Sequence, residues 1–260
     1  GDLAFAGFAA KFVVSGHESY QIKGKRYLVE KGEYILGNAG TMASIEINGH
    51  EDTKGLCVDI SERIINEVAD YHFSQSGDLK EFLLTDQFLV NTYKARNTNL
   101  GYALHEINRQ VSGGQHSNEL LNTELFYSIA ESIVADQAII YEQYSRLQFK
   151  KTETRQSLLR QLLEAREYMD AHLSDDIHLD QIIRNAFMSK YHFIRLFKAT
   201  FILSPYQYIL RKRLESARVQ LLGGSNVTET AFDAGYPDSS SFSKAFKAAF
   251  GVTPSSVKLK

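Results

Sequence analysis

The spacing of hydrophobic residues changes once along the chain, near residue 61. Before this point, short runs of β-branched and aromatic residues end in glycine at frequent intervals, as in FVVSG, SYQIKG and RYLVEKGEYILG. Such runs are typical of strands and turns. After it, apolar residues recur at steps of three and four, which predicts helices. We therefore expect an α+β fold in which residues 1–60 form a small antiparallel sheet or barrel and residues 61–150 add helices to the same N-terminal domain.

A long helix is predicted over residues 118–151. Its apolar positions fall at every seventh residue, namely Phe126, Ile133, Ile140 and Leu147. This repeat is typical of the seam between two paired helices. The seam could join a second copy of the chain in a symmetric dimer, which would make this a dimerisation helix, or it could pack on the N-terminal sheet of the same chain. Both readings stay open, because the seam is short and Gln137 interrupts it.

The polar stretch KKTETRQ at 150–156 is the expected boundary of a second, all-helical domain in residues 157–260. One helix of this domain begins at Ser204 and Pro205, an N-cap followed by proline at the first helical position. It runs to the two glycines at 223–224, which predict a stop. At 1.5 Å per residue, this linker helix is a rod of about 27 Å.

The same fourteen-residue pattern occurs twice in the C-terminal domain, 49 positions apart. Residues 192–205 read HFIRLFKATFILSP, and residues 241–254 read SFSKAFKAAFGVTP. Each copy predicts a helix with three phenylalanines on its inner face, which follows a short helix and a tight turn. The phenylalanines predict that each copy packs on a small three-helix core. Two helix-turn-helix units joined by the linker helix are therefore expected.

The formal net charge of −2 conceals an uneven distribution. Residues 189–260 carry eleven Lys and Arg against four Asp and Glu, a net charge of +7, and the other 188 residues carry 18 bases against 27 acids, a net charge of −9. A basic C-terminal part indicates a polyanionic partner. The alternative is a solvated charged face without a partner.

Helix-turn-helix units place their second helix in the major groove of double-stranded DNA. Arg195 and Lys244 occupy the same position in the two copies, and either can donate to a guanine, Arg in a bidentate fork. A rod of about 27 Å plus the widths of the attached helices can hold two units near the 34 Å of one DNA turn, so they can contact consecutive groove segments. The candidate DNA contacts are Ser189, Lys190, Tyr191, His192, Ile194, Arg195 and Lys198 in the first copy, Ser239, Ser240, Ser241, Lys244 and Lys247 in the second, and the basic linker-helix residues Arg211 and Arg213.

The run SKYHFIRLFKATF…SPYQYILRKRLESARVQLL, followed by VTETAFDAGYPDSSSFSKAFKAAFGVTP, resembles the DNA-binding domain of the AraC/XylS family of bacterial transcription regulators. The matching positions include Arg213, Ala217, Ala231, Gly235, Tyr236 for the usual Phe, Phe242, Phe246, Phe250, Gly251 and Pro254. The resemblance implies a promoter as the DNA partner, contact with RNA polymerase, and an N-terminal part that senses a small molecule or dimerises, often as a cupin-like β-barrel with helices.

Three departures from the family pattern bear on function. Ile202 stands where the first copy usually has glycine, and Val257 replaces an aromatic residue. The second reading helix offers small hydroxyls beside Lys244, which predicts that it chiefly contacts phosphate. His192 is expected at the surface, where it could contact phosphate.

The N-terminal region offers little catalytic chemistry. Tyr20, Tyr27 and Tyr34 are spaced by seven and could line an effector pocket or pack in a barrel. The histidines form no His-x-His cluster, so we expect no metal, no cofactor and no enzyme activity, although a cupin enzyme is the alternative. Cys57, the single cysteine, lies between Leu56 and Val58 and is expected to be buried. A third reading makes the N-terminal domain only a dimerisation or protein-interaction module.

The cellular location is inferred from what the sequence lacks. No apolar run approaches the roughly 20 residues that a bilayer span needs. A lone cysteine suits a reducing compartment. A cytoplasmic protein without membrane contact is expected.

Overall fold

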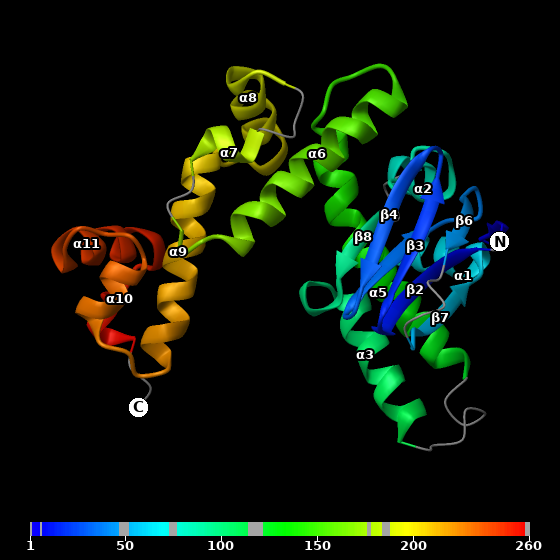
Figure 1. The fold of residues 1–260 in the computed structure, drawn as a ribbon, viewed down its shortest axis with the longest axis horizontal. Coiled ribbons are helices and arrows are strands. Elements are labelled where there is room, and N and C mark those ends of the chain that lie inside the picture. Colours follow the sequence, from blue (N-terminus) through cyan, green and yellow to red (C-terminus); the bar gives the residue numbers. More distant parts are fainter. Residues whose placement is uncertain are drawn as a thin grey trace. The chain divides into compact units, whose positions relative to one another are not determined.

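The computed structural model describes residues 2–5, 7–46, 52–72, 77–113, 122–175, 178–183 and 188–257. It divides into two compact units, the first formed by residues 1–145 and 150–156 and the second by residues 146–149 and 157–260. The first unit holds the strands and the second is helical (Figure 1). The expected α+β class is confirmed.

Two antiparallel four-stranded sheets form the first unit. The first sheet has the strand order β1 (Asp2–Ala4), β6 (Met42–Glu46), β3 (His17–Ile22) and β4 (Lys25–Glu30). The second sheet has the order β7 (Lys54–Ile60), β2 (Phe8–Ser15), β5 (Glu33–Gly37) and β8 (Asn91–Lys94). The sequence reading missed β8, because its four residues are all half-buried and carry no alternating pattern.

The two sheets share one hydrophobic core. Ala9, Val13 and Ile35 of the second sheet pack with Tyr20 and Tyr27 of the first. Side chains alternate between the faces of a strand, so the neighbouring residues of β2 and β5 point away from this core. The second sheet is therefore covered on both sides, by the first sheet and by helices.

The helices of the first unit cover the outer face of the second sheet. Phe8 of β2 packs edge-on against Phe88, with ring centroids 5.4 Å apart, and Phe12 packs against His105 at 4.8 Å. The helices are α1 (Glu62–His72), α2 (Gly77–Leu84), α3 (Asn99–Ser112) and α5 (Thr123–Ser145), and the 3-10 turn η1 (Ala95–Asn97) precedes α3.

The seven-residue seam of the long helix α5 packs against other elements of the same chain. Ile133 and Ile140 of α5 are buried, and α5 contacts α1, α2, α3 and β7. Gln137 lies in this buried stripe and donates to the hydroxyl of Tyr93 at 3.3 Å. The sheet and helices of the same chain therefore cover this seam, and dimerisation through α5 stays a prediction that would need another face of the helix. The helix ends at Ser145, and residues 118–121 of the predicted span lie outside the described residues.

The second unit is built from two long helices, α6 and α9, and several shorter ones. They are α6 (Thr152–Ala171), α7 (Leu179–Ile183), α8 (Lys190–Phe201), α9 (Pro205–Leu222), α10 (Val227–Asp233) and α11 (Ser239–Phe250), followed by the 3-10 turn η2 (Pro254–Ser256). α6 begins at Thr152, inside the polar stretch 150–156. Its buried stripe includes Leu159 and Leu162, whereas Leu158 is only half-buried.

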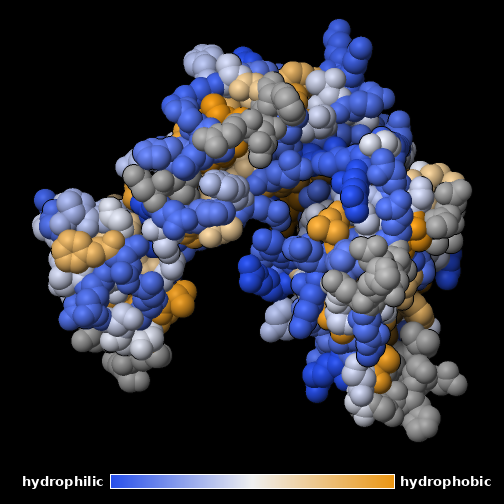
Figure 2. Space-filling view, in the orientation of Figure 1, coloured by the Kyte–Doolittle hydropathy of each residue, from blue (hydrophilic) through white to orange (hydrophobic). Residues whose placement is uncertain are grey.

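The surface is mostly hydrophilic in the view of Figure 2, and hydrophobic residues form small separate patches there. Among the helices that the structure describes, none combines the length and the apolar character needed to cross a membrane.

Candidate nucleic-acid interface

The second helix of each predicted helix-turn-helix unit, α8 and α11, is built in the same way. Both are twelve residues long, and their bounds are offset by the 49 positions of the sequence repeat. The side chain of Ser189 caps α8 by accepting from the backbone N–H of His192 at 3.3 Å, and that of Asp238 caps α11 by accepting from Ser241 at 2.7 Å. These caps satisfy N–H groups that have no partner inside the helix. We call α8 and α11 the reading helices.

Three phenylalanines hold the inner face of each reading helix in a core. In α8, the ring centroids of Phe193 and Phe197 are 5.6 Å apart, and both side chains are fully buried. In α11, the equivalent rings of Phe242 and Phe246 are 5.5 Å apart. The predicted packing role of the repeat is confirmed. Val257, which replaces a usual aromatic residue, packs against the second of these cores.

The long helix α9 connects the two helix-turn-helix units. Ser204 and Gln207 form a capping box at its start, and Gly223 ends it, so the predicted bounds are confirmed. α7 and α8 lie near its N-terminal end, and α10 and α11 pack along its C-terminal half (Figure 1). Each reading helix is therefore attached to a different part of one continuous rod.

The outer face of α8 carries cationic and aromatic side chains. Tyr191, Arg195 and Lys198 are exposed, and Tyr191 is 78% exposed. Lys190 is exposed as well, but its Nζ forms an ion pair with Asp180 of α7 at 3.0 Å. This face therefore presents Arg195 and Lys198 as the cations best placed for a polyanion.

His192 lies differently from the prediction. The residue is half-buried, and its Nε2 atom is enclosed without a hydrogen-bond partner in the described structure. It follows directly on the exposed Tyr191 and precedes the fully buried Phe193, so its ring lies at the edge of the core. His192 is better described as a residue of the core edge than as a surface contact.

The outer face of α11 is less cationic. Lys244 and Lys247 are exposed, as is Ser240. The hydroxyls of Ser239 and Ser241 already donate within the domain, to Thr228 at 3.3 Å and to Asp238 at 2.9 Å.

Asp238 adds a negative charge at the start of α11. Hydrogen bonding from the backbone N–H of Ser241 holds the pKa of Asp238 below its usual range, so this carboxylate is ionised at neutral pH. A carboxylate at this helix start repels a phosphate that the helix N–H groups would otherwise attract.

The two linker-helix arginines predicted as DNA contacts, Arg211 and Arg213, form hydrogen bonds inside the domain. Arg213 is half-buried and donates from Nε to the carbonyl of Leu173 at 2.8 Å and from a terminal nitrogen to that of Asp175 at 2.6 Å. Its guanidinium lies against Gly235, where a Cβ atom would come within 2.6 Å of it. Arg213 therefore ties α9 to the turn that follows α6, and its role as a DNA contact stays a prediction.

Arg211 braces the end of the second reading helix. Its guanidinium lies 5.1 Å from the ring centre of Phe250, and it also bonds to Glu215 at 3.1 Å and to the carbonyl of Ala249 at 3.4 Å. In the first helix-turn-helix unit, Arg166 of α6 lies over Phe201 in the same way, also at 5.1 Å. A cation over the last phenylalanine is thus a repeated structural feature, which the sequence pattern did not reveal because the arginines come from different helices.

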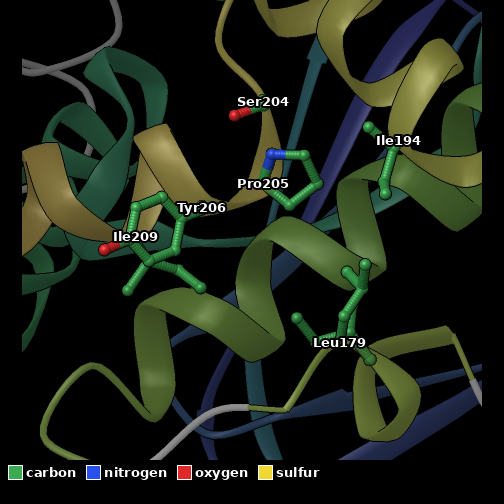
Figure 3. A pocket seen from close by; sticks show the side chains of 7 residues that line it. Leu179, Ile194, Ser204, Pro205, Tyr206 and Ile209 are labelled. Atoms are coloured by element: carbon green, nitrogen blue, oxygen red, sulfur yellow. The ribbon is translucent and has the colours of Figure 1, made fainter.

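An apolar pocket of about 210 Å³ lies beside α8. Figure 3 shows Ile194 of α8 and Leu179 of α7 on one side of it, and Pro205, Tyr206 and Ile209 of α9 on the other. Ile194 is only 36% exposed, so this candidate DNA contact is partly drawn into the pocket. Tyr206, an exposed aromatic at the pocket rim, was missed by the sequence reading, although its place directly after the helix-starting Pro205 could have indicated it.

The tyrosines proposed for an effector pocket do not share one. Tyr20 and Tyr27 are cross-strand partners in the core between the sheets. Tyr34 faces the helices, where its hydroxyl donates to Thr98 at 3.0 Å and its ring stacks on Tyr93 at 5.3 Å. Burial raises the pKa of all of Tyr20, Tyr34 and Tyr208 well above the usual range.

Cys57 was expected to be buried and is exposed. It sits on the edge strand β7, where its Sγ accepts from Nζ of Lys11 at 2.5 Å. Apolar neighbours do not bury a residue in a strand, because they point to the opposite face.

Comparison with known proteins identifies the second unit. Residues 182–259 match a family model described as a helix-turn-helix domain. LumQ of Photobacterium leiognathi, a probable transcriptional regulator, is 35% identical over 89 residues, which are 34% of this chain and 36% of that protein. The second unit contains an AraC/XylS-type helix-turn-helix domain.

Other similarities extend beyond this domain. YbfI of Bacillus subtilis, a helix-turn-helix transcriptional regulator, is 25% identical over 252 residues, which are 91% of this chain and 83% of that protein. A solved AraC-type regulator from Chromobacterium violaceum is 26% identical, covers 38% of this chain and 88% of its own, and superposes with a TM-score of 0.36. The chain spans about a third of the length of the first curated relatives that it matches.

Proposed function

We propose that the protein is a sequence-specific DNA-binding transcription regulator. The observation that carries this proposal is the pair Arg195 and Lys244. They occupy one position of a structural repeat, both are exposed, and each lies on the outer face of a helix whose inner face is fixed by phenylalanines. In a helix-turn-helix unit this face enters the major groove. The net charge of +7 over residues 189–260 supports a polyanionic partner.

The two reading helices make different kinds of contact with DNA. α8 reads bases, since the guanidinium of Arg195 can donate in a bidentate fork to guanine. α11 contacts mainly the phosphate backbone through Lys244, Lys247 and Ser240, because the hydroxyls of Ser239 and Ser241 are already bonded inside the domain. Base specificity then comes chiefly from α8, and affinity comes from both reading helices.

The first unit controls this binding as a sensor of a small molecule. The resemblance to AraC/XylS regulators supports this role, and it supports RNA polymerase as a partner and the cytoplasm as the location. A homodimer remains compatible with the proposal but would need a surface other than the buried seam of α5. The relatives are transcription regulators, which favours regulation over a cupin enzyme as the function.

The test uses the full chain and DNA fragments selected from a genomic library by repeated binding. Gel-shift titrations then compare the best fragment with a scrambled one. Arg195→Ala should weaken binding to the selected fragment by about 1–3 kcal/mol and leave scrambled DNA nearly unaffected. Lys244→Ala should weaken both fragments alike and reduce the salt dependence by about one phosphate contact.

Arg63→Ala is the matched control, because Arg63 is an exposed arginine of the first unit whose guanidinium forms an ion pair with Glu67. It should leave binding to both fragments unchanged. Undiminished binding by Arg195→Ala to the selected fragment would remove α8 as the base-reading helix. Failure of the wild-type chain to select any sequence would remove the function itself.

A further inference from the structure

The outer face of the second sheet is incompletely covered at its edge. β7 is the edge strand, and its Leu56 and Val58 pair with Phe12 and Ala10 of β2. Cross-strand partners point to the same face, and Phe12 contacts His105 of α3. Leu56 and Val58 therefore face the helices, yet both stay half-buried.

A cavity of about 250 Å³ lies over these two residues. α3 contributes Ile107 and Val111 to its walls, and α5 contributes Phe126. The full lining is Leu56, Cys57, Val58, Asp59, Ile107, Gln110, Val111, Leu125, Phe126 and Ile129. A strand and two helices thus enclose a concave, mainly apolar space inside the first unit, separate from the core between the sheets.

The polar groups of the cavity are few and specific. Cys57 pairs with Lys11 and Asp59 pairs with Ala9, a residue of the core between the sheets, so their side chains point to the opposite face. Gln110 is thus the polar side chain of the lining that can face the cavity. Its Nε2 donates to Glu106 at 2.7 Å, which directs its carbonyl oxygen to serve as a hydrogen-bond acceptor.

We propose that this cavity is the effector site of the first unit and takes a compact, uncharged molecule with an apolar body and one hydroxyl group. A dry apolar cavity of 150 Å³ holds benzene, so this volume suits a molecule of about ten non-hydrogen atoms. The hydroxyl donates to Gln110. A charged ligand is disfavoured, because none of the described lining side chains that face the cavity carries an opposite charge to offset the loss of hydration.

A small molecule fits this site better than a second copy of the chain does. The walls come from three elements and the space is concave, whereas a symmetric dimer needs a self-complementary surface of several hundred Å² per partner. The inference rests on the proposed sensory role, and it adds the position and chemical class of the ligand.

Isothermal titration of the full chain with 4-ethylphenol tests the proposal, and 4-ethylbenzoate serves as the charged analogue of similar shape. Saturable binding of 4-ethylphenol is expected, with the carboxylate at least 10-fold weaker. Val111→Trp should weaken 4-ethylphenol binding at least 10-fold by filling the cavity. Val111 is 48% exposed, so the larger side chain is compatible with folding.

Ile139→Trp is the matched control, because Ile139 is 55% exposed on α5 and does not line the cavity. It should bind 4-ethylphenol as the wild type does, and thermal unfolding of both variants shows that they are folded. Absence of saturable binding, equal binding of the carboxylate, or undiminished binding by folded Val111→Trp would overturn the proposal.

Gel shifts with the selected DNA fragment separate this inference from the proposed function. DNA binding without 4-ethylphenol binding would end the inference and leave the regulator intact. Binding of 4-ethylphenol without DNA binding would end the proposed regulator function and leave the ligand site in place. Sedimentation at several protein concentrations checks that a loss of ligand binding is not caused by self-association over the cavity, and such self-association would count against the proposal.

Discussion

Ile202 ends α8 in the same left-handed backbone conformation in which Gly251 ends α11, with φ values of 69° and 74°. Glycine adopts this conformation at little steric cost, but a β-branched residue is strained there. The two helix-turn-helix units therefore share one chain path, although the first reaches it with an unfavourable residue.

Ile202→Gly should stabilise the second unit by about 1 kcal/mol, because it removes the left-handed strain. Ile202 is 60% exposed, so little burial is lost. Gly251→Ile should destabilise by a similar amount. Thermal unfolding of the full chain measures both, and Ile202→Ala serves as the control that keeps the strain and should gain much less. A destabilised Ile202→Gly would show that the isoleucine contributes more than its exposure indicates.

Removal of two tyrosine hydroxyls of the second unit should change the stability of the protein in opposite directions. The hydroxyl of Tyr236 is buried and has no hydrogen-bond partner in the described structure, so Tyr236→Phe should stabilise by about 1 kcal/mol. The hydroxyl of Tyr208 donates to both carboxylate oxygens of Asp170, at 2.9 and 3.0 Å. Tyr208→Phe should destabilise by about 1.5–3 kcal/mol. Urea unfolding of the two variants in parallel gives the comparison, and the same sign for both would contradict it.

Substitution of Arg213 should chiefly lower stability, whereas substitution of Arg195 should chiefly weaken DNA binding. Arg213→Ala removes two hydrogen bonds from a half-buried guanidinium and should destabilise the second unit by about 2–3 kcal/mol. Arg195→Ala removes an exposed side chain and should change stability by less than about 0.5 kcal/mol. Unfolding curves and gel shifts on the same preparations test the contrast. A folded Arg213→Ala protein with normal stability but lost DNA affinity would identify Arg213 as a direct contact.

Asp180 should restrain DNA binding through Lys190. The exposed ion pair between them contributes about 0–1 kcal/mol to stability, so Asp180→Asn should leave folding nearly unchanged. It should raise DNA affinity by a few fold at low salt, because it removes a negative charge from the edge of the reading face and releases Lys190 for phosphate. The effect should shrink as salt screens the charges. Asp70→Asn, which breaks the ion pair with Lys80 in the first unit, is the control and should have no effect.

The helices of the second unit could be predicted from the sequence, because the caps, stripes and stops that define them are local. The cap at Ser189, the three-phenylalanine stripes and the stop at Gly223 each depend on residues within one or two turns. Helix periodicity alone places Arg195 opposite Phe193 and Phe197, so the exposed position of this candidate could be predicted before any tertiary contact was known.

The contacts of other residues could not be predicted, because they depend on segments that meet only in the folded chain. The apolar stripe of α5 fits a partner helix and the same-chain layer equally well, and only the position of α1, α2 and α3 decides between them. Arg213 looks like any exposed base of a DNA-binding helix until the turn that follows α6 brings the carbonyls of Leu173 and Asp175 to it.

The linear order of residues thus determined the repeat, the helix ends and the outward faces of the reading helices, because backbone hydrogen bonding and side-chain period act over a few residues. Tertiary packing decided which arginines are braces, that Cys57 is exposed, and where a cavity opens between β7, α3 and α5. These outcomes depend on contacts between segments far apart in the chain, and such contacts leave no period in the sequence.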